Sequence, residues 1–451
     1  MAVVGAGLAG LTAAYELARN GFEVTVLEAR DRVGGRVYTL RDPFADGQFA
    51  EGGGEHIDGG HTAIRAYAEH FGLALDDTRE DLRGLRGVVY RQGRRRAHRR
   101  SFAPPFPRPF MRRMEELAQQ VDPEDPPAGT GGELDGRSLA DVFDEFELGA
   151  EMRWLMEHRA RVEFGVEARR LSLLFHAWLI KLTEDQPWSE TEVYRIRGGN
   201  DSLPRAFAGK LGDRIVLRSA VSQIDADAEG VRLRGAAGIL RARYAVVAVP
   251  VPALRSISFT PALPGQLREA IARLQYGVAT KTPLQYDQRF WREMGFNGNT
   301  VTELPVGMTW EATTAQPGRA GILMAYASAD DGARLGALEE HERVAAVRAQ
   351  LERIYPDAGA RVVGSSTVAW GSDPYSRGAY VAFAPGQVNR FWRALRTPVG
   401  RIHFAGEHTD SYASYMEGAV RSGMRVAQAI GRRESGPLVT PGRHPERGPV
   451  S

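Results

Sequence analysis

The first thirty residues of the chain show three hydrophobic patterns in succession. AVV at residues 2 to 4 is a short apolar run, the apolar spacing from Leu8 to Arg19 has the period of an amphipathic helix, and FEVTVLE alternates like a strand. A glycine turn separates the first run from the helix. These patterns predict a βαβ unit, which indicates an α/β fold with a parallel sheet.

Later segments contain both strand and helix patterns. RIVLRSAVSQID, ARYAVVAVP and GILMAYAS predict strands, and LEEHERVAAVRAQLERIY predicts a long amphipathic helix. Residues 61–197 are arginine-rich and mostly helical in period, and RQGRRRAHRR within them predicts an exposed hairpin that turns at Gly93. We find no internal repeat and no second G-x-G-x-x-G before a helix, so a built-in site for a nicotinamide dinucleotide is not supported.

Composition excludes several kinds of site and partner. The 451 residues include no cysteine, so disulfides and thiolate chemistry are excluded, and we expect no metal site. A net charge of +2 spread along the chain gives no reason to expect nucleic acid. No apolar run approaches the ~18 residues of a membrane span, and the N-terminal pattern is not that of a signal peptide, so we expect a cytoplasmic location without a membrane partner. The sequence leaves open whether the chain forms a homodimer.

Gly5, Gly7 and Gly10 stand between the first strand and the helix, in the pattern G-x-G-x-x-G. Here the first glycine permits a tight turn, the second lets the backbone approach a pyrophosphate, and the third lets helix and strand pack closely. Glu28 ends the second strand, where a carboxylate can accept hydrogen bonds from ribose hydroxyls. The alternative, a nucleotide-free βαβ unit with a surface glutamate, explains fewer of these features, so we predict a dinucleotide site.

A second glycine pair follows within eight residues of Glu28. Gly34, Gly35 and Arg36 can add N–H donors and a bidentate cation to the same diphosphate, although a Gly-Gly hairpin with a solvent-facing arginine is an alternative for Arg36. The run ARDRVGGRVYTL resembles the FAD-binding signature of the flavin-containing amine oxidase family. The resemblance implies an α/β fold with a Rossmann-like FAD-binding domain of the glutathione-reductase type, assembled from non-contiguous segments, beside an α+β substrate-binding domain.

The resemblance also implies domain boundaries. Residues 1–60, 198–285 and 395–433 are expected in the FAD-binding domain, and residues 61–197 and 286–394 in the substrate-binding domain. The tail, residues 434–451, is rich in Pro, Gly and charge, which predicts disorder.

Further blocks of the chain are similar to motifs of the family. They are AEGGGEHIDGG at residues 50–60, GGNDSLPRAFAGKL at residues 198–211, and residues 401–430. The resemblance implies that FAD lies along both glycine turns and reaches the start of the last helix, whose positive end would face the flavin. The residues expected to bind FAD are Gly5, Gly7, Leu8, Ala9, Gly10, Glu28, Ala29, Arg30, Gly34, Gly35, Arg36, Gly53, Gly54, Glu55, Val221, Gly406, Glu407, Tyr415, Met416 and Ala419.

Three side chains on positions that match the family are expected to act in catalysis. Tyr380 and Tyr415 would flank the substrate amine, and Lys281 would hold a water beside flavin N5. Core tyrosines and a snorkelling lysine are the alternatives. Ala379 stands where the mammalian monoamine oxidases carry the cysteine that bonds to the flavin, so the FAD is expected to be non-covalent.

The implied reaction is oxidative deamination, in which a hydride equivalent passes to flavin N5, the imine is hydrolysed, and dioxygen reoxidises the flavin to give hydrogen peroxide. A primary amine or polyamine is favoured, held by Glu55, His56, Tyr380 and Tyr415, with Glu55 able to recognise a second ammonium. An L-amino acid is the main alternative and needs a cation for its carboxylate, such as Arg65. A desaturase of the carotenoid and porphyrinogen type, and a flavoprotein that binds without turnover, are further alternatives.

Overall fold

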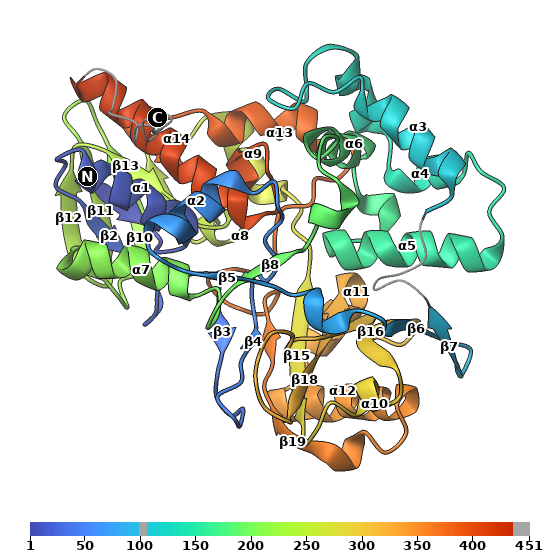
Figure 1. Cartoon of the computed structure of the whole chain (residues 1–451). Coiled ribbons are helices and arrows are strands. Elements are labelled where there is room, and N and C mark those ends of the chain that lie inside the picture. Colours follow the sequence, from blue (N-terminus) through green and yellow to red (C-terminus); the bar gives the residue numbers. More distant parts are fainter. Residues whose placement is uncertain (99–105, 436–451) are drawn as a thin grey trace, which may run out of the picture.

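The computed structural model describes residues 1–98 and 106–435. Figure 1 shows three parts: a lobe around the N-terminal βαβ unit, a second lobe built on the largest sheet, and a layer of helices from residues 108–182 above that sheet. Across these described ranges, no helix combines the length and the apolar character needed to cross a bilayer.

Five parallel strands form the central sheet of the first lobe. Their order is β21 (Ile402–Phe404), β13 (Ala245–Val247), β1 (Ala2–Val4), β2 (Thr25–Leu27) and β9 (Ile215–Val216). Ala2 and Val4 belong to one hydrophobic core and Val3 to another, because successive side chains of a strand point to opposite faces. The sheet is therefore buried on both faces and gathers segments from the whole chain, as predicted, although the strand predicted from FEVTVLE is shorter.

Helix α1 (Leu8–Arg19) has the bounds predicted from the sequence, and α14 (Met416–Ser435) packs along it. Glycines allow the close contact on both sides of α1. A Cβ on Gly10 would lie 2.0 Å from a carbonyl oxygen of the glycine turn, and a Cβ on Gly423 would lie 2.5 Å from the carbonyl oxygen of Ala9. Helix α14 reaches two residues into the tail that was predicted to be disordered, and residues 436–451 lie outside the described ranges.

The second lobe contains an eight-stranded sheet. Its order is β19 (Val362–Ser365), β15 (Ala279–Tyr286), β18 (Gly321–Ser328), β17 (Met308–Glu311), β16 (Phe296–Thr302), β6 (Arg86–Arg91) and β7 (Arg94–His98), with β20 (Val368–Ala369) paired to β15. The predicted hairpin at Gly93 is confirmed as β6 and β7 over its described part. The pairing of β15 corrects one predicted boundary: residues 279–285 belong to this sheet, so the boundary lies before residue 279.

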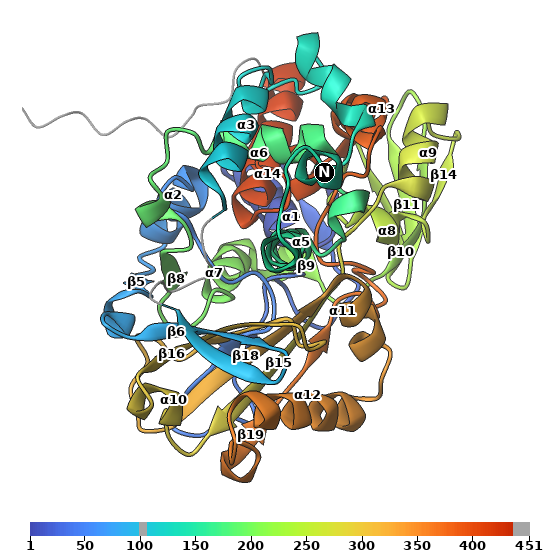
Figure 2. The ribbon, with the colours of Figure 1, turned by 90° about the vertical axis from the view of Figure 1, so that its right-hand side faces the viewer.

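Helices cover both faces of the large sheet. Figure 2 shows α5 (Ala150–Phe164) above it and α12 (Glu340–Ile354), the predicted amphipathic helix, below it. All eight residues of β15 are buried as a result. The other helices of the upper layer are α3 (Arg108–Ala118), α4 (Leu139–Phe143), α6 (Leu173–Leu182) and α13 (Gln387–Arg396).

The remaining elements connect these layers. A four-stranded sheet beside the first lobe contains β12 (Gly238–Ala242), β11 (Val231–Gly235), β10 (Val221–Ala226) and β14 (Ser258–Thr260). Two short strand pairs are β3 (Thr39–Leu40) with β4 (Ala50–Glu51), and β5 (Leu75–Asp77) with β8 (Tyr194–Ile196). Further helices are α2 (Thr62–His70), α7 (Ser202–Leu211), α8 (Val251–Leu254), α9 (Gly265–Arg273), α10 (Phe290–Glu293) and α11 (Ala329–Gly336).

Candidate active site

A cavity of about 1740 Å³ extends from the carboxyl ends of the parallel strands to the large sheet. Ligands of open parallel sheets bind outside the carboxyl ends of the strands. Every residue predicted to bind FAD lines this cavity except Gly10, which lies behind the turn and packs against it. His56, Lys281 and Tyr380 line it too, so the fold brings the predicted cofactor, substrate and catalytic residues to one place.

The two glycine turns lie against each other at one end of the cavity. The N–H of Gly34 donates to the carbonyl of Ala6 at 2.8 Å, and a Cβ on Gly35 would lie 3.3 Å from the Cα of Gly7. Gly5 has a φ of 99°, a conformation that glycine adopts without strain. Because side chains are missing at these positions, both backbones can approach a diphosphate, which fits the predicted dinucleotide.

Glu28 is held in place by the backbone. Its side chain is buried and accepts hydrogen bonds from the N–H of Ala6 at 2.7 Å and of Arg30 at 2.9 Å. An ionised carboxylate has about four lone-pair sites, so two are left for ribose hydroxyls. The Arg30 guanidinium pairs with Asp373 and donates to Ser376 at 2.9 Å, so its partners are side chains of the protein.

Arg36 and Glu407, both predicted near the diphosphate, form an ion pair of 3.0 Å. Arg36 also donates to the carbonyl of Ala379, and Glu407 accepts a hydrogen bond from the N–H of Ser414 at 2.9 Å. The alternative of a solvent-facing Arg36 is therefore wrong, because the guanidinium points inward. Its ion pair connects the second glycine pair to the turn that follows β21. The donor groups and open backbone at this end of the cavity fit FAD.

Lys281 lies in the middle of the buried strand β15 and is 7% exposed, so it is not a snorkelling lysine. Its ammonium donates to the carbonyls of Glu51 at 3.1 Å and Gly53 at 2.9 Å, and to Glu55 Oε2 at 2.7 Å. An ammonium has three N–H donors, and protein acceptors engage all three. The predicted water beside Lys281 would therefore have to share one of these donors.

Glu55 does not face the substrate end with a free carboxylate, which corrects the prediction that it recognises a second ammonium. One oxygen binds Lys281, and the other forms an ion pair of 2.7 Å with Arg195 Nη2 and accepts a hydrogen bond of 2.7 Å from Trp310 Nε1. Burial alone would raise the pKa of Glu55, but the two cations outweigh it and lower the pKa to about 2. Sequence reasoning missed Arg195 and Trp310, which lie 140 and 255 residues from Glu55.

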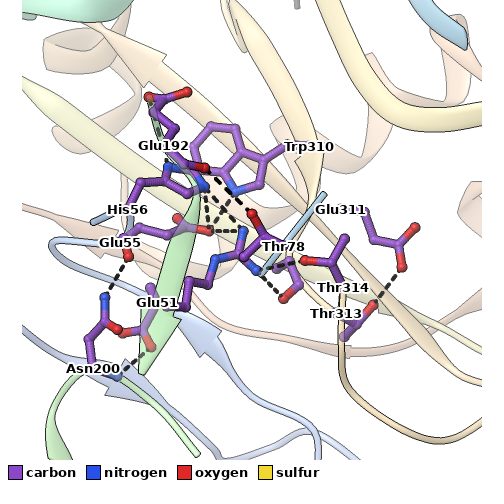
Figure 3. A network of polar contacts seen from close by, with 12 residues as sticks. Glu51, Glu55, His56, Thr78, Glu192, Asn200, Trp310, Glu311, Thr313 and Thr314 are labelled. Carbon is purple, nitrogen blue, oxygen red and sulfur yellow. Dashed lines mark hydrogen bonds and ion pairs between the residues drawn. The ribbon is translucent and has the colours of Figure 1, made fainter. Parts of the chain in front are cut away.

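His56 continues this network towards the cavity (Figure 3). Its Nε2 lies 3.3 Å from Arg195 Nη2, and because a guanidinium only donates, Nε2 must be the acceptor. The proton of the neutral ring is then on Nδ1, which lies 3.9 Å from Glu192 Oε1. Burial, assisted by Arg195 and Lys281, lowers the pKa of His56 to about 3, so the ring is neutral at physiological pH.

Three tyrosines line the substrate end of the cavity. The hydroxyl of Tyr380 donates to the carbonyl of Glu163 at 2.6 Å and lies 3.3 Å from the hydroxyl of Tyr326. Tyr415 packs edge-on against His61, with 5.2 Å between ring centroids. Tyr326 was missed because its position depends on the pairing of β18 with β15, where it stands opposite Lys281.

Two carboxylates that the sequence did not single out also line this end. Glu163 lies in the last turn of α5, and Glu192 precedes β8. Desolvation within the cavity, reinforced by Asp58, raises the pKa of Glu163, and desolvation with Asp58 and Glu163 raises that of Glu192 to about 8. Glu192 has a φ of 54°, a strain of about 1 kcal/mol for a residue with a Cβ.

Two arginines near the substrate end differ in whether they line the cavity. Arg65, one candidate for binding a carboxylate, does not line the cavity; it donates to the carbonyl of Gly59 and lies over the ring of Tyr194 at 5.4 Å. Arg159 does line it and stacks over Phe106 at 4.0 Å. Among the residues that the structure describes, no group of His, Asp and Glu side chains is arranged to hold a metal ion.

Sequence comparison identifies the family. A model of the flavin-containing amine oxidoreductase family matches residues 8–431. The chain belongs to this family. It is 30% identical to a flavin-containing amine oxidase of Danio rerio, over 95% of this chain and 85% of that protein. It is also 29% identical to a putative L-amino-acid oxidase of Bacillus subtilis, over 95% of this chain and 94% of that protein.

Solved structures of the family share the whole fold. Putrescine oxidase bound to putrescine is similar with a TM-score of 0.84 and 27% identity, covering 95% of this chain and 98% of that chain. The family and enzyme class predicted from the sequence are confirmed, as is the predicted fold class. The protein is a flavin-containing oxidoreductase that acts on amines, which gives the glycine-lined end of the cavity its ligand class.

Proposed function

We propose that the protein binds FAD non-covalently and oxidises primary amines, with diamines and polyamines preferred to L-amino acids. One observation carries the proposal: a single cavity joins the glycine-lined end to an end lined by Tyr380, Tyr415 and the carboxylates of Glu163 and Glu192. The chain contains no cysteine to form a thioether with the flavin, which supports non-covalent binding.

FAD would be held by both glycine turns, by Glu28 and by the paired Arg36 and Glu407. When bound, the flavin supplies the redox chemistry, taking two electrons and the α-hydrogen from the amine and passing the electrons to dioxygen to give hydrogen peroxide. Tyr380 and Tyr415 would hold the neutral amine in position and exclude water around it. Lys281 would place a positive charge at the boundary between the cofactor and the large sheet.

The carboxylates support a cationic substrate. Glu163 and Glu192 bring two acidic groups to this end of the cavity, where Arg159 lowers the pKa of Glu163 and the Glu55-bound Arg195 lowers that of Glu192. We assign recognition of a second ammonium to Glu163, because the carboxylate of Glu55 is occupied by Lys281 and Arg195. A relative of similar fold binds putrescine, a diamine.

An L-amino acid is the second candidate, and one observation favours it. Arg159 lines the cavity and could form a bidentate pair with a carboxylate, and one relative of the chain is a putative L-amino-acid oxidase. The acidic neighbours Glu163 and Glu192 would repel that same carboxylate, which is why amines are preferred here.

Anaerobic bleaching of the bound flavin tests the proposal. The holoenzyme would be mixed without oxygen with monoamines, diamines, polyamines and L-amino acids, and flavin absorbance followed by stopped flow. Bleaching fastest with diamines or polyamines, followed by peroxide release when air is admitted, is the expected result. Bleaching by L-amino acids alone would favour L-amino acid oxidation instead. If none of these compounds bleaches the flavin, both candidate functions are wrong.

A further inference from the structure

At the substrate end of the cavity, Glu192 has a carboxylate and a backbone conformation for which the fold itself gives no structural reason. Its side chain is 45% exposed, and because the residue lines the cavity, that surface faces the cavity. Its Oε1 lies 3.9 Å from His56 Nδ1, which is beyond hydrogen-bond distance. Its left-handed backbone is fixed by its own N–H, which donates to Asp58 Oδ1 at 2.8 Å. The fold therefore holds an unpaired carboxylate against the substrate space.

A fixed N–H faces this carboxylate. Arg195 occupies His56 Nε2, so the ring presents Nδ1–H to Glu192 Oε1 at 3.9 Å (Figure 3). The ion pair of 2.7 Å between Arg195 and Glu55 holds the guanidinium in place. Because His56 stays neutral and its Nδ1 lies beyond hydrogen-bond distance, it directs an N–H dipole at the carboxylate of Glu192 but places no full charge beside it.

The groups around Glu192 keep its charge poorly stabilised. Desolvation by the residues that surround the cavity is the largest cause of its raised pKa, and the nearby acids Asp58, Glu163 and Glu55 add to it. Arg195 opposes them, and the neutral His56 contributes no charge. The charge of Glu192 contributes to raising the pKa of Tyr326 and of Tyr415, so Glu192 lies near these two tyrosines of the cavity.

An amine substrate arrives with a proton that it must lose. Alkylammonium groups have pKa values of about 10, so nearly all of the amine is cationic near pH 7. The lone pair on nitrogen, which assists loss of the α-hydrogen, is free only in the neutral amine. A carboxylate whose proton affinity is close to that of the amine can accept this proton, and general-base catalysis of this kind contributes about 10²- to 10⁴-fold.

We propose that Glu192 accepts the proton of the substrate ammonium, with His56 and Arg195 as positioning residues; this inference rests on the proposed amine oxidation. In the step, one N–H bond of the ammonium breaks, its electron pair stays on nitrogen, and an O–H bond forms on the Glu192 carboxylate. No electrons are transferred, so the step needs no oxidant. The reactive complex then contains one proton shared between the amine and Glu192.

The pH dependence of flavin reduction tests this sharing. The rate of anaerobic reduction at low substrate concentration would be measured from pH 6 to 10.5 with two monoamines of different pKa. The wild-type profile is expected to be bell-shaped, with an acid limb set by Glu192 and a basic limb that moves with the pKa of the substrate. In Glu192→Gln, which binds only neutral amine, the rate should be lower by about 10²-fold at pH 7 and rise through the substrate pKa without falling.

Matched variants separate this role from others. Glu163→Gln removes an acid that raises the pKa of Glu192, so with monoamines the profile should stay bell-shaped while its acid limb moves to lower pH. His56→Phe keeps an aromatic ring but loses Nδ1–H, so the acid limb should move to higher pH. Flavin absorbance confirms that each variant is folded and loaded. A bell-shaped profile in Glu192→Gln would overturn the inference while leaving the proposed function intact, whereas a wild-type enzyme that no amine bleaches would remove the proposed function itself.

Discussion

Lys281 and Glu55 form a buried ion pair of 2.7 Å, in which a lysine from the large sheet binds an acid from the segment after β4. Arg195 binds the other oxygen of Glu55 at 2.7 Å, so one carboxylate joins two cations. Charges taken out of water are stable only when they are paired and hydrogen-bonded, and this network meets that condition. It also couples the strand that carries Lys281 to the wall of the cavity.

Replacing Lys281 with Met should slow the reaction with dioxygen more than it affects flavin binding. Flavin contacts at the two glycine turns stay intact, whereas the positive charge at the cavity wall is lost. Stopped-flow reoxidation of the reduced enzyme measures the effect, for which we expect a fall of at least about 10-fold. Lys210→Met, at the exposed end of α7, is the matched control. Equal reoxidation rates in the two variants would assign Lys281 a purely structural role.

Acid should weaken the folded state partly through Glu55. The folded pKa of about 2 lies below the ordinary value of 4.5, so the stabilisation is complete above pH 4.5 and is lost as pH falls towards 2. The difference corresponds to about 3 kcal/mol. Urea unfolding at pH 6 and pH 3 should show wild type losing more stability than Glu55→Gln, while the exposed Glu229→Gln behaves like wild type. A wild type that loses no more than Glu55→Gln would contradict the assigned ion pairs.

Glu163→Gln should discriminate between substrates with one and two ammonium groups. If Glu163 recognises the distal ammonium, removing its charge costs a charge-assisted hydrogen bond of about 1.5 to 3 kcal/mol, or at least 10-fold in kcat/KM for a diamine. A monoamine of similar length should change much less. Steady-state peroxide release with putrescine and butylamine provides the comparison. Equal losses for both amines would move the distal site elsewhere.

The contact between α1 and α14 should tolerate no side chain at Gly423. A Cβ there would lie 2.5 Å from a backbone carbonyl, so Gly423→Ala must separate the helices and should cost about 1 to 3 kcal/mol. Gly209 in α7 has open space around a Cβ, and Gly209→Ala should stabilise the protein by about 0.5 to 1 kcal/mol. Thermal unfolding of the two holoenzymes compares them. A stable Gly423→Ala would show that the helices can part without cost.

The flavin should leave the protein completely on denaturation. The chain contains no cysteine that could form a thioether with the flavin. Precipitation with trichloroacetic acid should leave a colourless pellet and a yellow supernatant whose flavin matches the holoenzyme content. Colour retained in the pellet would mean that another residue type forms a covalent bond.

The local parts of this protein can be predicted from the sequence alone. The bounds of α1 follow from the glycine turn and the 3.6-residue spacing of apolar positions, and the hairpin at Gly93 follows from its turn. The family and the fold class follow from short motifs, and all but one of the residues predicted to bind FAD line one cavity, because a diphosphate needs open backbone within a few residues.

The tertiary structure alone decided how the charges are paired. Glu55 looks the same in the sequence whether it binds a substrate ammonium or Lys281, Arg195 and Trp310, because those partners come from three distant segments. Strand register places Tyr326 opposite Lys281, and desolvation within the cavity raises the pKa of Glu163 and Glu192. Ion pairing and desolvation depend on distances across the fold, which local patterns do not contain.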